Sequence, residues 1–397
     1  MIQDARIRWE EGDLACSAFW HSENGIAPHK KVVTANDTLT ADDAYHLACE
    51  GTAILWKGDF QSARQLLQAL VRRIDKPSKK SKRAGKRVDK LGEATTQKTA
   101  KDIFNQYRLV KSQRARILGM LLIQCNADHT ISLRRAPDIT QACLEAYGVA
   151  NQSYVVSLRE LLGVISAYEW RKNGLPILAD SDGEPVYVHP HYGVFSPVRG
   201  EYIELVCNAP LPKALDTDSS AFDIGVGTGV LSIILAMRGV EQIIATDQDD
   251  RALVCAQENI TDLNLDSQIE IVKANLFPSG RAALVVCNPP WIPARPSSTL
   301  EHAVYDPDSH MLKGFLDGLK DHLIPQGEAW LILSDLAEHL GLRTRQELLA
   351  WIERADLTVL ARIDTKPKHP KAGDESDLLH FARSAEITSL WRLRVQH

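Results

Sequence analysis

The chain has 397 residues, of which 44% are hydrophobic and 24% are charged. These values are ordinary for a globular protein and exclude a disordered or fibrous chain, and the length allows two or three domains. The net charge of −5 is unevenly distributed, because residues 72–116 hold sixteen Lys or Arg against four Asp or Glu. Such a basic segment indicates a polyanionic partner, since clustered cations bind phosphate backbones by releasing counterions.

The seven cysteines are scattered, without a CxxC pair or a regular spacing. This distribution indicates free thiols in a reducing compartment and argues against a zinc module. The N-terminal sequence MIQDARIRWEEGDL lacks the apolar core of a signal peptide, and no apolar run reaches the roughly 18 residues of a membrane span. We therefore expect a cytoplasmic protein without a membrane segment.

Residues 1–75 are predicted to form a mostly helical domain. The stretch TLTADDAYHLACEG has Thr40 as a helix N-cap and Gly51 as a stop. A second helix begins near Gly58, and its apolar residues have the spacing of one buried face: Phe60, Ala63, Leu66, Leu67 and Leu70. Before these helices, IRWEEGDLACSAFW fits a β-hairpin.

Residues 76–100 are predicted to be a flexible basic linker, because KPSKKSKRAGKRVDK has almost nothing apolar to bury. The charge run alone does not tell a binding segment from a solvated one. Residues 101–185 are predicted to be helical. KDIFNQYRLVKSQRARILGMLLIQC fits one helix with basic side chains on a shared side, and SLRELLGVISAYEWRKNG fits a second that ends at Gly174.

From residue 186 to residue 397 the pattern changes to short β-rich runs that alternate with helices. The β-rich runs are FDIGVG, QIIATD, IEIVKA, ALVVC, AWLILSD, LTVLARID and ITSLWRLRV. Strands that alternate with helices indicate βαβ units, hence an α/β fold with a largely parallel sheet covered on both faces. We place the catalytic domain in this half of the chain.

The stretch FDIGVGTGVLSIILAM describes a strand that enters a glycine-rich turn and then a helix. Gly225, Gly227 and Gly229 lack a Cβ, so the backbone can turn sharply and approach a ligand at the helix N-terminus. Asp247 ends the next strand, where an acidic side chain would accept hydrogen bonds from both ribose hydroxyls. The pair favours a nucleoside-containing cofactor, which is either a dinucleotide or S-adenosylmethionine.

A third motif, NPPW at residues 288–291, follows the fourth strand. An exocyclic amine or an amide nitrogen is a poor nucleophile because its lone pair is delocalised, and an acceptor such as the Asn288 oxygen can localise that pair. The prolines restrict the backbone and so hold the acceptor in place, and Trp291 offers a ring on which a flipped base or a planar amide can stack. In isolation NPPW also fits a simple turn with a core tryptophan; the two motifs before it favour catalysis.

In this order the three motifs resemble the class I S-adenosylmethionine-dependent methyltransferases, and among them the amino-methyltransferase branch with the small-domain enzymes and the adenine N-methylases. The resemblance covers about residues 187–397. It implies a Rossmann-like, seven-stranded methyltransferase sheet with S-adenosylmethionine as cofactor. It also implies that Asp223 supports the loop at the methionine end of the cofactor, that Asn275, where Asp is commoner, faces the adenine, and that the Pro289 carbonyl is a second acceptor.

Two further features lie beside these motifs. His189 and His191 have i, i+2 spacing without a Cys or acidic partner, so we expect no metal site. The resemblance implies instead that the following YGVFSP loop covers the site, with Phe195 and Arg199 as contacts. If LTVLARID is parallel to the core strands, the next loop opens on the ligand edge and could touch a substrate backbone. Its basic residues are Lys366, Lys368, His369 and Lys371.

Three functions are compatible with these observations. The first is N-methylation of a nucleobase, with RNA favoured, because NPPW occurs together with the basic segment 72–116. The second is N-methylation of a protein glutamine, since a carboxamide nitrogen poses the same lone-pair problem. The third is a non-catalytic RNA-binding or assembly factor that has kept a methyltransferase fold, because fold alone does not guarantee activity.

Overall fold

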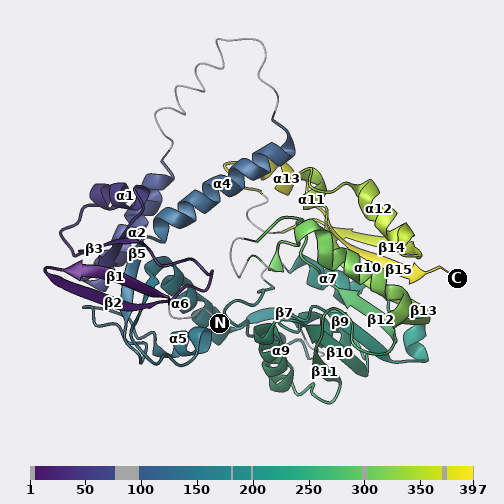
Figure 1. Cartoon of the computed structure of the whole chain (residues 1–397). Helices are drawn as coiled ribbons and strands as arrows, with labels where there is room; N and C mark the ends of the chain where they lie inside the picture. The colour runs from purple at the N-terminus through teal and green to yellow at the C-terminus, as the bar shows by residue number, and fades with distance from the viewer. Residues whose placement is uncertain are drawn as a thin grey trace, which may run out of the picture. The chain divides into compact units, whose positions relative to one another are not determined.

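The computed structural model describes residues 5–76, 98–179, 182–197, 200–296, 301, 303–368 and 373–396. They divide into two compact units (Figure 1). The first lies within residues 1–98 and 105–168, and the second comprises residues 99–104 and 169–397. Within the described part of the chain, no helix combines the length and the apolar character that a membrane crossing needs.

The first unit is built on a six-stranded sheet in the order β1-β2-β6-β5-β4-β3. Its strands are β1 (Arg6–Glu11), β2 (Leu14–Trp20), β3 (Lys31–Ala35), β4 (Thr52–Trp56), β5 (Leu121–Cys125) and β6 (Tyr154–Ser157). The helices in this half of the chain are α1 (Ala41–Cys49), α2 (Phe60–Ile74), α4 (Ala100–Leu118), α5 (Thr140–Tyr147) and α6 (Leu158–Asn173).

Several local predictions for this unit are confirmed. The β1–β2 hairpin forms, and the Thr40 side chain caps α1. Helix α2 buries the predicted face, from Phe60 to Leu70, and α6 ends at the residue before Gly174. These features could be predicted because caps, glycine stops and the helical period act over a few residues.

Helical residues outnumber strand residues in this half of the chain, as expected, but its sheet was not predicted beyond the β1–β2 hairpin. LLIQC, assigned above to the end of a long helix, is strand β5, and it pairs with β4 on one side and with β6 on the other. A short apolar run has no period that separates a buried strand from a buried helix. These pairings also place strands from the predicted regions 1–75 and 101–185 in one sheet. Residues 77–97 of the predicted linker lie outside the described residues.

The second unit contains the predicted seven-stranded sheet, in the order β11-β10-β9-β12-β13-β15-β14. Its strands are β9 (Ser220–Ile224), β10 (Gln242–Asp247), β11 (Ile269–Lys273), β12 (Ala282–Cys287), β13 (Leu323–Ser334), β14 (Leu357–Thr365) and β15 (Thr388–Val395). Strands β9 to β13 are parallel, whereas β15 runs antiparallel to both β13 and β14. Strand β14 is therefore parallel to the core strands.

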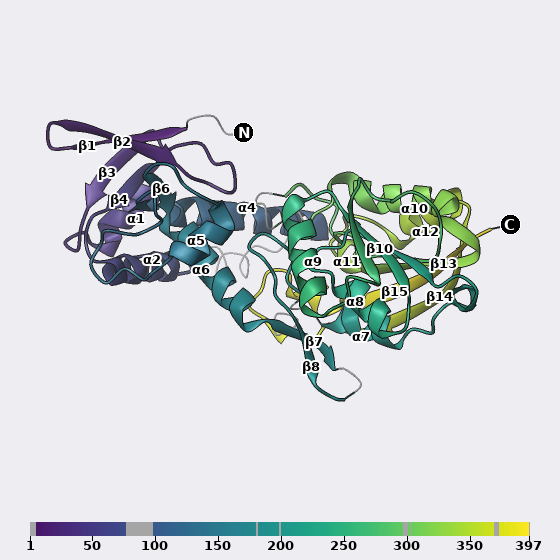
Figure 2. The same ribbon diagram turned by 90° about the horizontal axis from the view of Figure 1, so that it is seen from below.

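Helices cover both faces of this sheet (Figure 2). They are α7 (Glu201–Asn208), α8 (Val230–Met237), α9 (Asp250–Asp262), α10 (His310–His322), α11 (Leu336–His339), α12 (Arg345–Arg354) and α13 (His380–Arg383), with short 3-10 turns η1 (Lys213–Asp216) and η3 (Pro307–Ser309). A separate hairpin, β7 (Leu175–Ala179) with β8 (Pro185–Val188), precedes the sheet.

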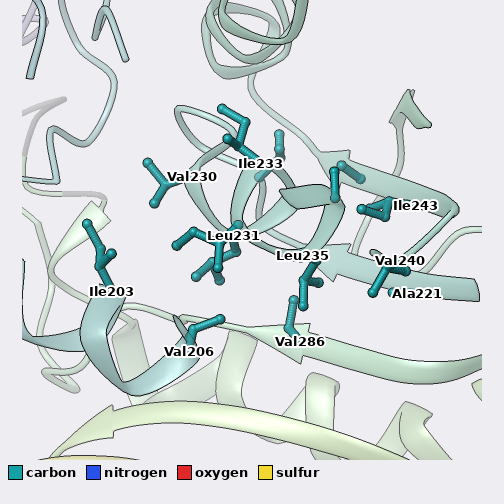
Figure 3. Packing of buried hydrophobic residues seen from close by; sticks show 14 of the residues in the cluster. Ile203, Val206, Ala221, Val230, Leu231, Ile233, Leu235, Val240, Ile243 and Val286 are labelled. Atoms are coloured by element: carbon teal, nitrogen blue, oxygen red, sulfur yellow. The ribbon is translucent and has the colours of Figure 1, made fainter. Parts of the chain in front are cut away.

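Alternation along the central strand β12 shows why the sheet is buried on both sides. Leu284 and Val286 pack into the cluster formed with α7, α8 and α9, part of which is drawn in Figure 3. Val285 and Cys287 point the other way, into the cluster formed with α10 and α12. Every residue of β12 is buried, as expected for a parallel strand between two helical layers.

We expect Gly318→Ala to destabilise the second unit. A Cβ at Gly318 would overlap the Phe277 ring, which is stacked between Phe315 and His322 and cannot easily move. Overpacking of this kind costs about 1 to 3 kcal/mol, which outweighs the gain of about 1 kcal/mol from replacing a helical glycine. Urea unfolding measures the change. Gly163→Ala in α6 is the control, because a Cβ there meets nothing within 4 Å and should stabilise the protein. Equal shifts for both variants would contradict the packing argument.

Candidate cofactor and acceptor site

The predicted site residues follow the carboxyl ends of neighbouring parallel strands. Thr246 of β10 and Cys287 of β12 both pair with Ile224 of β9. Asp247 and Asn288 are therefore level with Gly225, and adjacent strands lie about 4.8 Å apart. The strand register thus brings together the three motifs that the sequence separates by up to 60 residues.

The turn after β9 depends on glycine. Gly225, Gly227 and Gly229 have φ angles of 82°, 54° and 85°, a region that other residues seldom adopt. The N–H of Gly225 donates to the Thr246 carbonyl at 2.9 Å, which fixes the turn against β10. A Cβ built on Gly227 would meet no atom within 4 Å, so the backbone there faces open space. A ligand can approach this turn closely.

Asp223, in β9 just before the turn, is fully buried. Its Oδ2 accepts two hydrogen bonds from Ser232, one from the backbone N–H at 3.0 Å and one from the hydroxyl at 2.7 Å. Its Oδ1 is buried too and has no hydrogen-bond partner among the described residues. Burial raises the pKa of Asp223 to about 6, the Asp247 charge adds to this, and the Ser232 bonds oppose it. The orphan oxygen is suited to a cationic donor.

Asp247 is half-buried at the end of β10. Its Oδ2 accepts from the Gly227 N–H at 3.2 Å, and its Oδ1 accepts from the Asp249 N–H at 3.0 Å. Burial raises the pKa of this carboxyl, while these backbone donors lower it. Each oxygen keeps further acceptor capacity, because an ionised carboxylate has about four acceptor positions. A pair of vicinal hydroxyls fits such a carboxylate.

Asn275 lies in the loop after β11, the strand that pairs with β10. Asp247 is the last residue of β10. The N–H of Ala274 donates to the Asp247 carbonyl at 3.1 Å, and the Asn275 side chain is exposed. The following residue, Leu276, has a positive φ of 69°, and its carbonyl accepts from the Thr246 hydroxyl at 2.5 Å. Asn275 is thus placed on the same edge of the sheet, one strand beyond Asp247.

The NPPW segment leaves β12 and is anchored at both ends. Asn288 and Trp291 are half-buried, Pro289 is buried, and the Trp291 Nε1–H donates to the Asn288 Oδ1 at 2.9 Å. Immediately afterwards, Ile292 forms a β-bridge with Tyr305. This arrangement fixes where the Asn288 carboxamide stands relative to the glycine turn.

Four residues of the site were not predicted from the sequence. Besides Ser232, the buried Asn259 in α9 accepts from the His189 N–H and donates to the Thr228 carbonyl of the glycine turn. The buried Asp306 accepts from the first N–H groups of α10, and Met311 lies against Gly225. The contacts of Asn259 and Met311 join residues far apart in the sequence, and no local motif marks any of the four.

The two neighbouring histidines have protein partners. His189 Nδ1 is 2.6 Å from the Arg171 carbonyl, and His191 Nε2 is 2.8 Å from Glu258, which also pairs with Arg171. The acidic partner that the local sequence lacked thus comes from α9. Among the residues that the structure describes, no group of three or more His, Cys, Asp or Glu side chains is arranged to hold a metal ion.

The loop expected to cover the site and the loop expected to touch a substrate backbone are both described only in part. Phe195 packs against the core cluster of α7 to α9, and Arg199 lies outside the described residues. In the loop after β14, Lys368 forms an ion pair with Glu204 at 2.7 Å. His369 and Lys371 of this loop are likewise outside the described residues. The expected substrate contact of Lys368 therefore competes with an internal carboxylate.

Comparison with known proteins gives a family match within the second unit. Residues 205–305 match the family model described as Ribosomal protein L11 methyltransferase (PrmA). The chain is 30% identical over 140 residues to the ribosomal protein L11 methyltransferase of Clostridium perfringens, which covers 31% of this chain and 44% of that protein. It is 28% identical over 159 residues to the tRNA1(Val) (adenine(37)-N6)-methyltransferase of a Shewanella species, covering 38% and 65%. The chain thus spans less than two thirds of either relative.

Comparison with solved structures finds the ribosomal protein L11 methylase from Lactobacillus delbrueckii subsp. bulgaricus among others. It has a TM-score of 0.36 and 15% identity, and covers 54% of this chain and 86% of that chain. Another is an S-adenosylmethionine-dependent methyltransferase from Clostridium acetobutylicum, with a TM-score of 0.32, 13% identity and coverage of 45% and 84%.

We expect Asp247→Ala to weaken binding of S-adenosylmethionine by about ten- to a hundredfold, because hydrogen bonds to a charged group contribute about 1.5 to 3 kcal/mol. Titration calorimetry measures the dissociation constant. Asp250→Ala is the matched control: this carboxylate lies three residues away, is exposed and pairs with Lys273. If both variants bind as the wild type does, Asp247 has no part in the cofactor site.

We expect Asp223 to make the second unit less stable as the pH rises from about 4 to about 6. The folded pKa of about 6 lies above the ordinary value of 3.8, so the native state holds the proton more tightly than the unfolded chain. The contribution of this proton to the free energy of unfolding is fully present below pH 4. About 2 to 3 kcal/mol of it is lost by pH 6 to 7. Asp223→Asn should remove this component of urea unfolding measured against pH. The same pH profile in both proteins would contradict the assignment.

Proposed function

Because the second unit belongs to the class I S-adenosylmethionine-dependent methyltransferases, we propose that this chain transfers a methyl group to a planar exocyclic nitrogen. The observation that carries the proposal is the position of Asn288, level with Gly225 in the neighbouring strand. An amide oxygen beside the cofactor turn can accept a hydrogen from an amino group, which is what a delocalised nitrogen requires of its catalyst.

The cofactor, when bound, supplies an electrophilic methyl group on a sulfonium centre. In our proposal its ribose hydroxyls donate to Asp247, and the glycine turn allows its close approach. The carboxylate of Asp223, whose buried Oδ1 has no described partner, would favour the positive charge of its ammonium group. Asn275, in the loop after the adjacent strand β11, would face the adenine. These assignments give the ribose hydroxyls, the ammonium group and the adenine each a side chain of suitable chemistry.

The acceptor nitrogen is held by the NPPW segment. In the proposed mechanism, the Asn288 oxygen accepts one N–H and the Pro289 carbonyl accepts the other, so the nitrogen becomes more tetrahedral and its lone pair points at the methyl group. The Trp291 ring supports the planar group, a contact worth about 1 to 3 kcal/mol for a base. Pre-set acceptors of this kind lower the barrier by orientation and electrostatics, without a titrating base. Transfer would break the sulfur–methyl bond as the nitrogen–carbon bond forms, release the thioether form of the cofactor, and leave the methylated nitrogen to lose one proton to solvent.

A nucleobase in RNA is the acceptor that we favour. The segment 72–116 is strongly basic, and its described part includes the exposed Lys111 and Arg116 in α4. Arg114 is less available, because Asp75 accepts two hydrogen bonds from it. One relative is named for N6-methylation of a tRNA adenine, a reaction at an exocyclic amine. Charge and chemistry therefore agree on a structured RNA.

A protein acceptor is the second candidate. The family model that matches residues 205–305 is named for methylation of a ribosomal protein. A glutamine amide has the same planar nitrogen and the same need for two hydrogen-bond acceptors. The basic segment does not exclude it, because a ribosomal protein is met among RNA phosphates.

We expect Asn288→Ala to lower methyl transfer by about a hundredfold or more, since removal of one electrostatic contact to the reacting group has effects of this size. S-adenosylmethionine binding should be nearly unchanged. Transfer is measured with labelled cofactor and an extract from cells that lack this chain. Asn208→Ala, the same change at an exposed position of α7, is the control. Full activity of Asn288→Ala would overturn the mechanism.

The labelled product identifies the acceptor. Loss of label on nuclease treatment supports the RNA proposal, and nucleoside analysis then names the nitrogen. Loss on protease treatment supports the protein candidate instead. If the wild-type protein binds the cofactor but labels nothing, a non-catalytic RNA-binding or assembly role becomes the better explanation.

A further inference from the structure

The hydrogen bond between Trp291 and Asn288 concerns the atom on which the proposed chemistry depends. The indole Nε1–H donates to the Asn288 Oδ1 at 2.9 Å, across three residues of the same loop. The tryptophan is therefore more than a flat surface for a substrate ring. It uses one of the two lone pairs of the oxygen that the proposed mechanism requires.

An asparagine at this place has an orientation problem. Its carboxamide carries an acceptor oxygen and a donor NH₂ of nearly equal size, and rotation about the last side-chain bond exchanges them. Only the oxygen can accept a hydrogen from an amino group. If the carboxamide were rotated the other way, its NH₂ group would face the substrate amino group, and two hydrogen-bond donors repel each other.

An indole solves this problem because it is a donor only. Trp Nε1–H can bind the oxygen of Asn288 and has no favourable interaction with the NH₂ group. Phenylalanine has a ring without a donor. Tyrosine has a hydroxyl that both donates and accepts, so it can bind either end of a carboxamide. Among the aromatic residues that can stack on a substrate, only tryptophan combines a large ring with this discrimination.

The tryptophan ring is itself held firmly. Trp291 is half-buried and packs against both core clusters, on either side of the end of β12. The next residue, Ile292, bridges to Tyr305, and its carbonyl accepts from the Asp306 N–H at 2.9 Å. The Asp306 carboxylate in turn accepts from Met311 and Leu312 at the start of α10. The indole donor therefore has a fixed position before a substrate arrives.

We propose that Trp291 is a positioning residue that fixes the oxygen of Asn288 as the acceptor, through its indole N–H, and leaves the second lone pair of that oxygen for the substrate amino group. This inference rests on the proposed N-methyltransferase function. It differs from the stacking role, because it assigns the effect to one hydrogen atom rather than to the ring.

A double-mutant cycle separates the two roles. Trp291→Phe keeps an aromatic ring and removes the donor. It should lower kcat by about three- to tenfold, which corresponds to the loss of one modest hydrogen bond. The KM for the acceptor fraction of the extract and the KM for the cofactor should change little. Trp291→Ala also removes the ring and should raise the KM for the extract fraction as well.

The second arm of the cycle uses Asn288→Asp. Both oxygens of a carboxylate accept hydrogen bonds, so no orientation has to be selected. In this background Trp291→Phe should change kcat by less than about twofold, because the carboxylate makes the positioning hydrogen bond dispensable. An equal loss in both backgrounds would assign Trp291 to stacking alone. Trp170→Phe, the same substitution at a side chain that is 54% exposed, is the control and should leave kcat unchanged.

A spectroscopic arm tests the hydrogen bond without relying on turnover. In a ¹H–¹⁵N correlation spectrum, the Trp291 indole signal is identified by its absence from Trp291→Phe. It should shift and exchange faster with solvent in Asn288→Ala, and it should remain protected in Asn288→Asp. An unchanged indole signal in Asn288→Ala would refute the proposal. If the wild type transfers no methyl group, the proposed function fails, whereas this arm still reports on the hydrogen bond itself.

Discussion

The site depends on one carboxylate held inside the protein core. Asp223 is fully buried at the end of β9, and its Oδ2 accepts two hydrogen bonds from Ser232 in the first turn of α8. These bonds tie the strand to the helix across the glycine turn and so set the shape of that turn. Burying a charge without full compensation is costly, and Oδ1 has no partner among the described residues. The fold thus keeps an uncompensated acceptor just before the glycine turn, and a cationic ligand would stabilise it.

The NPPW segment and the glycine turn are joined through α10. The Asp306 backbone donates to Ile292, just after NPPW, while the Asp306 side chain caps the helix. Met311, in the first turn of that helix, lies so close to the glycine turn that a Cβ on Gly225 would be 2.9 Å from its methyl carbon. A change in either loop would have to move the helix between them. Alignment of a nitrogen with a methyl group tolerates little displacement, so a rigid link of this kind serves the proposed reaction.

Much of the second unit could be predicted from the sequence, and less of the first. The parallel sheet follows from alternating strands and helices, and its site follows from three motifs that each act over a few residues. The sheet of the first unit was missed because strands such as β5 and β6 have only five and four residues, too few to show a period.

Asn259 and Ser232 were missed for a different reason. Their roles arise from contacts with Thr228 and Asp223 that only the folded chain brings together. The indole bond of Trp291 likewise depends on a side-chain direction that the letters NPPW do not contain.

The glycine-rich motif fits either a dinucleotide or S-adenosylmethionine. The charges at the sheet edge help to distinguish these two cofactors. Asp223 and Asp247 both have pKa values raised by burial, and the charge of Asp247 raises the pKa of Asp223 further. A dinucleotide would bring a doubly negative pyrophosphate to the turn between them, where it would add to this repulsion. S-adenosylmethionine brings a sulfonium and an ammonium group instead, with a single carboxylate. The Asp223 carboxylate, whose Oδ1 has no described partner, therefore favours the cationic cofactor, and this physical preference is independent of the resemblance carried by NPPW.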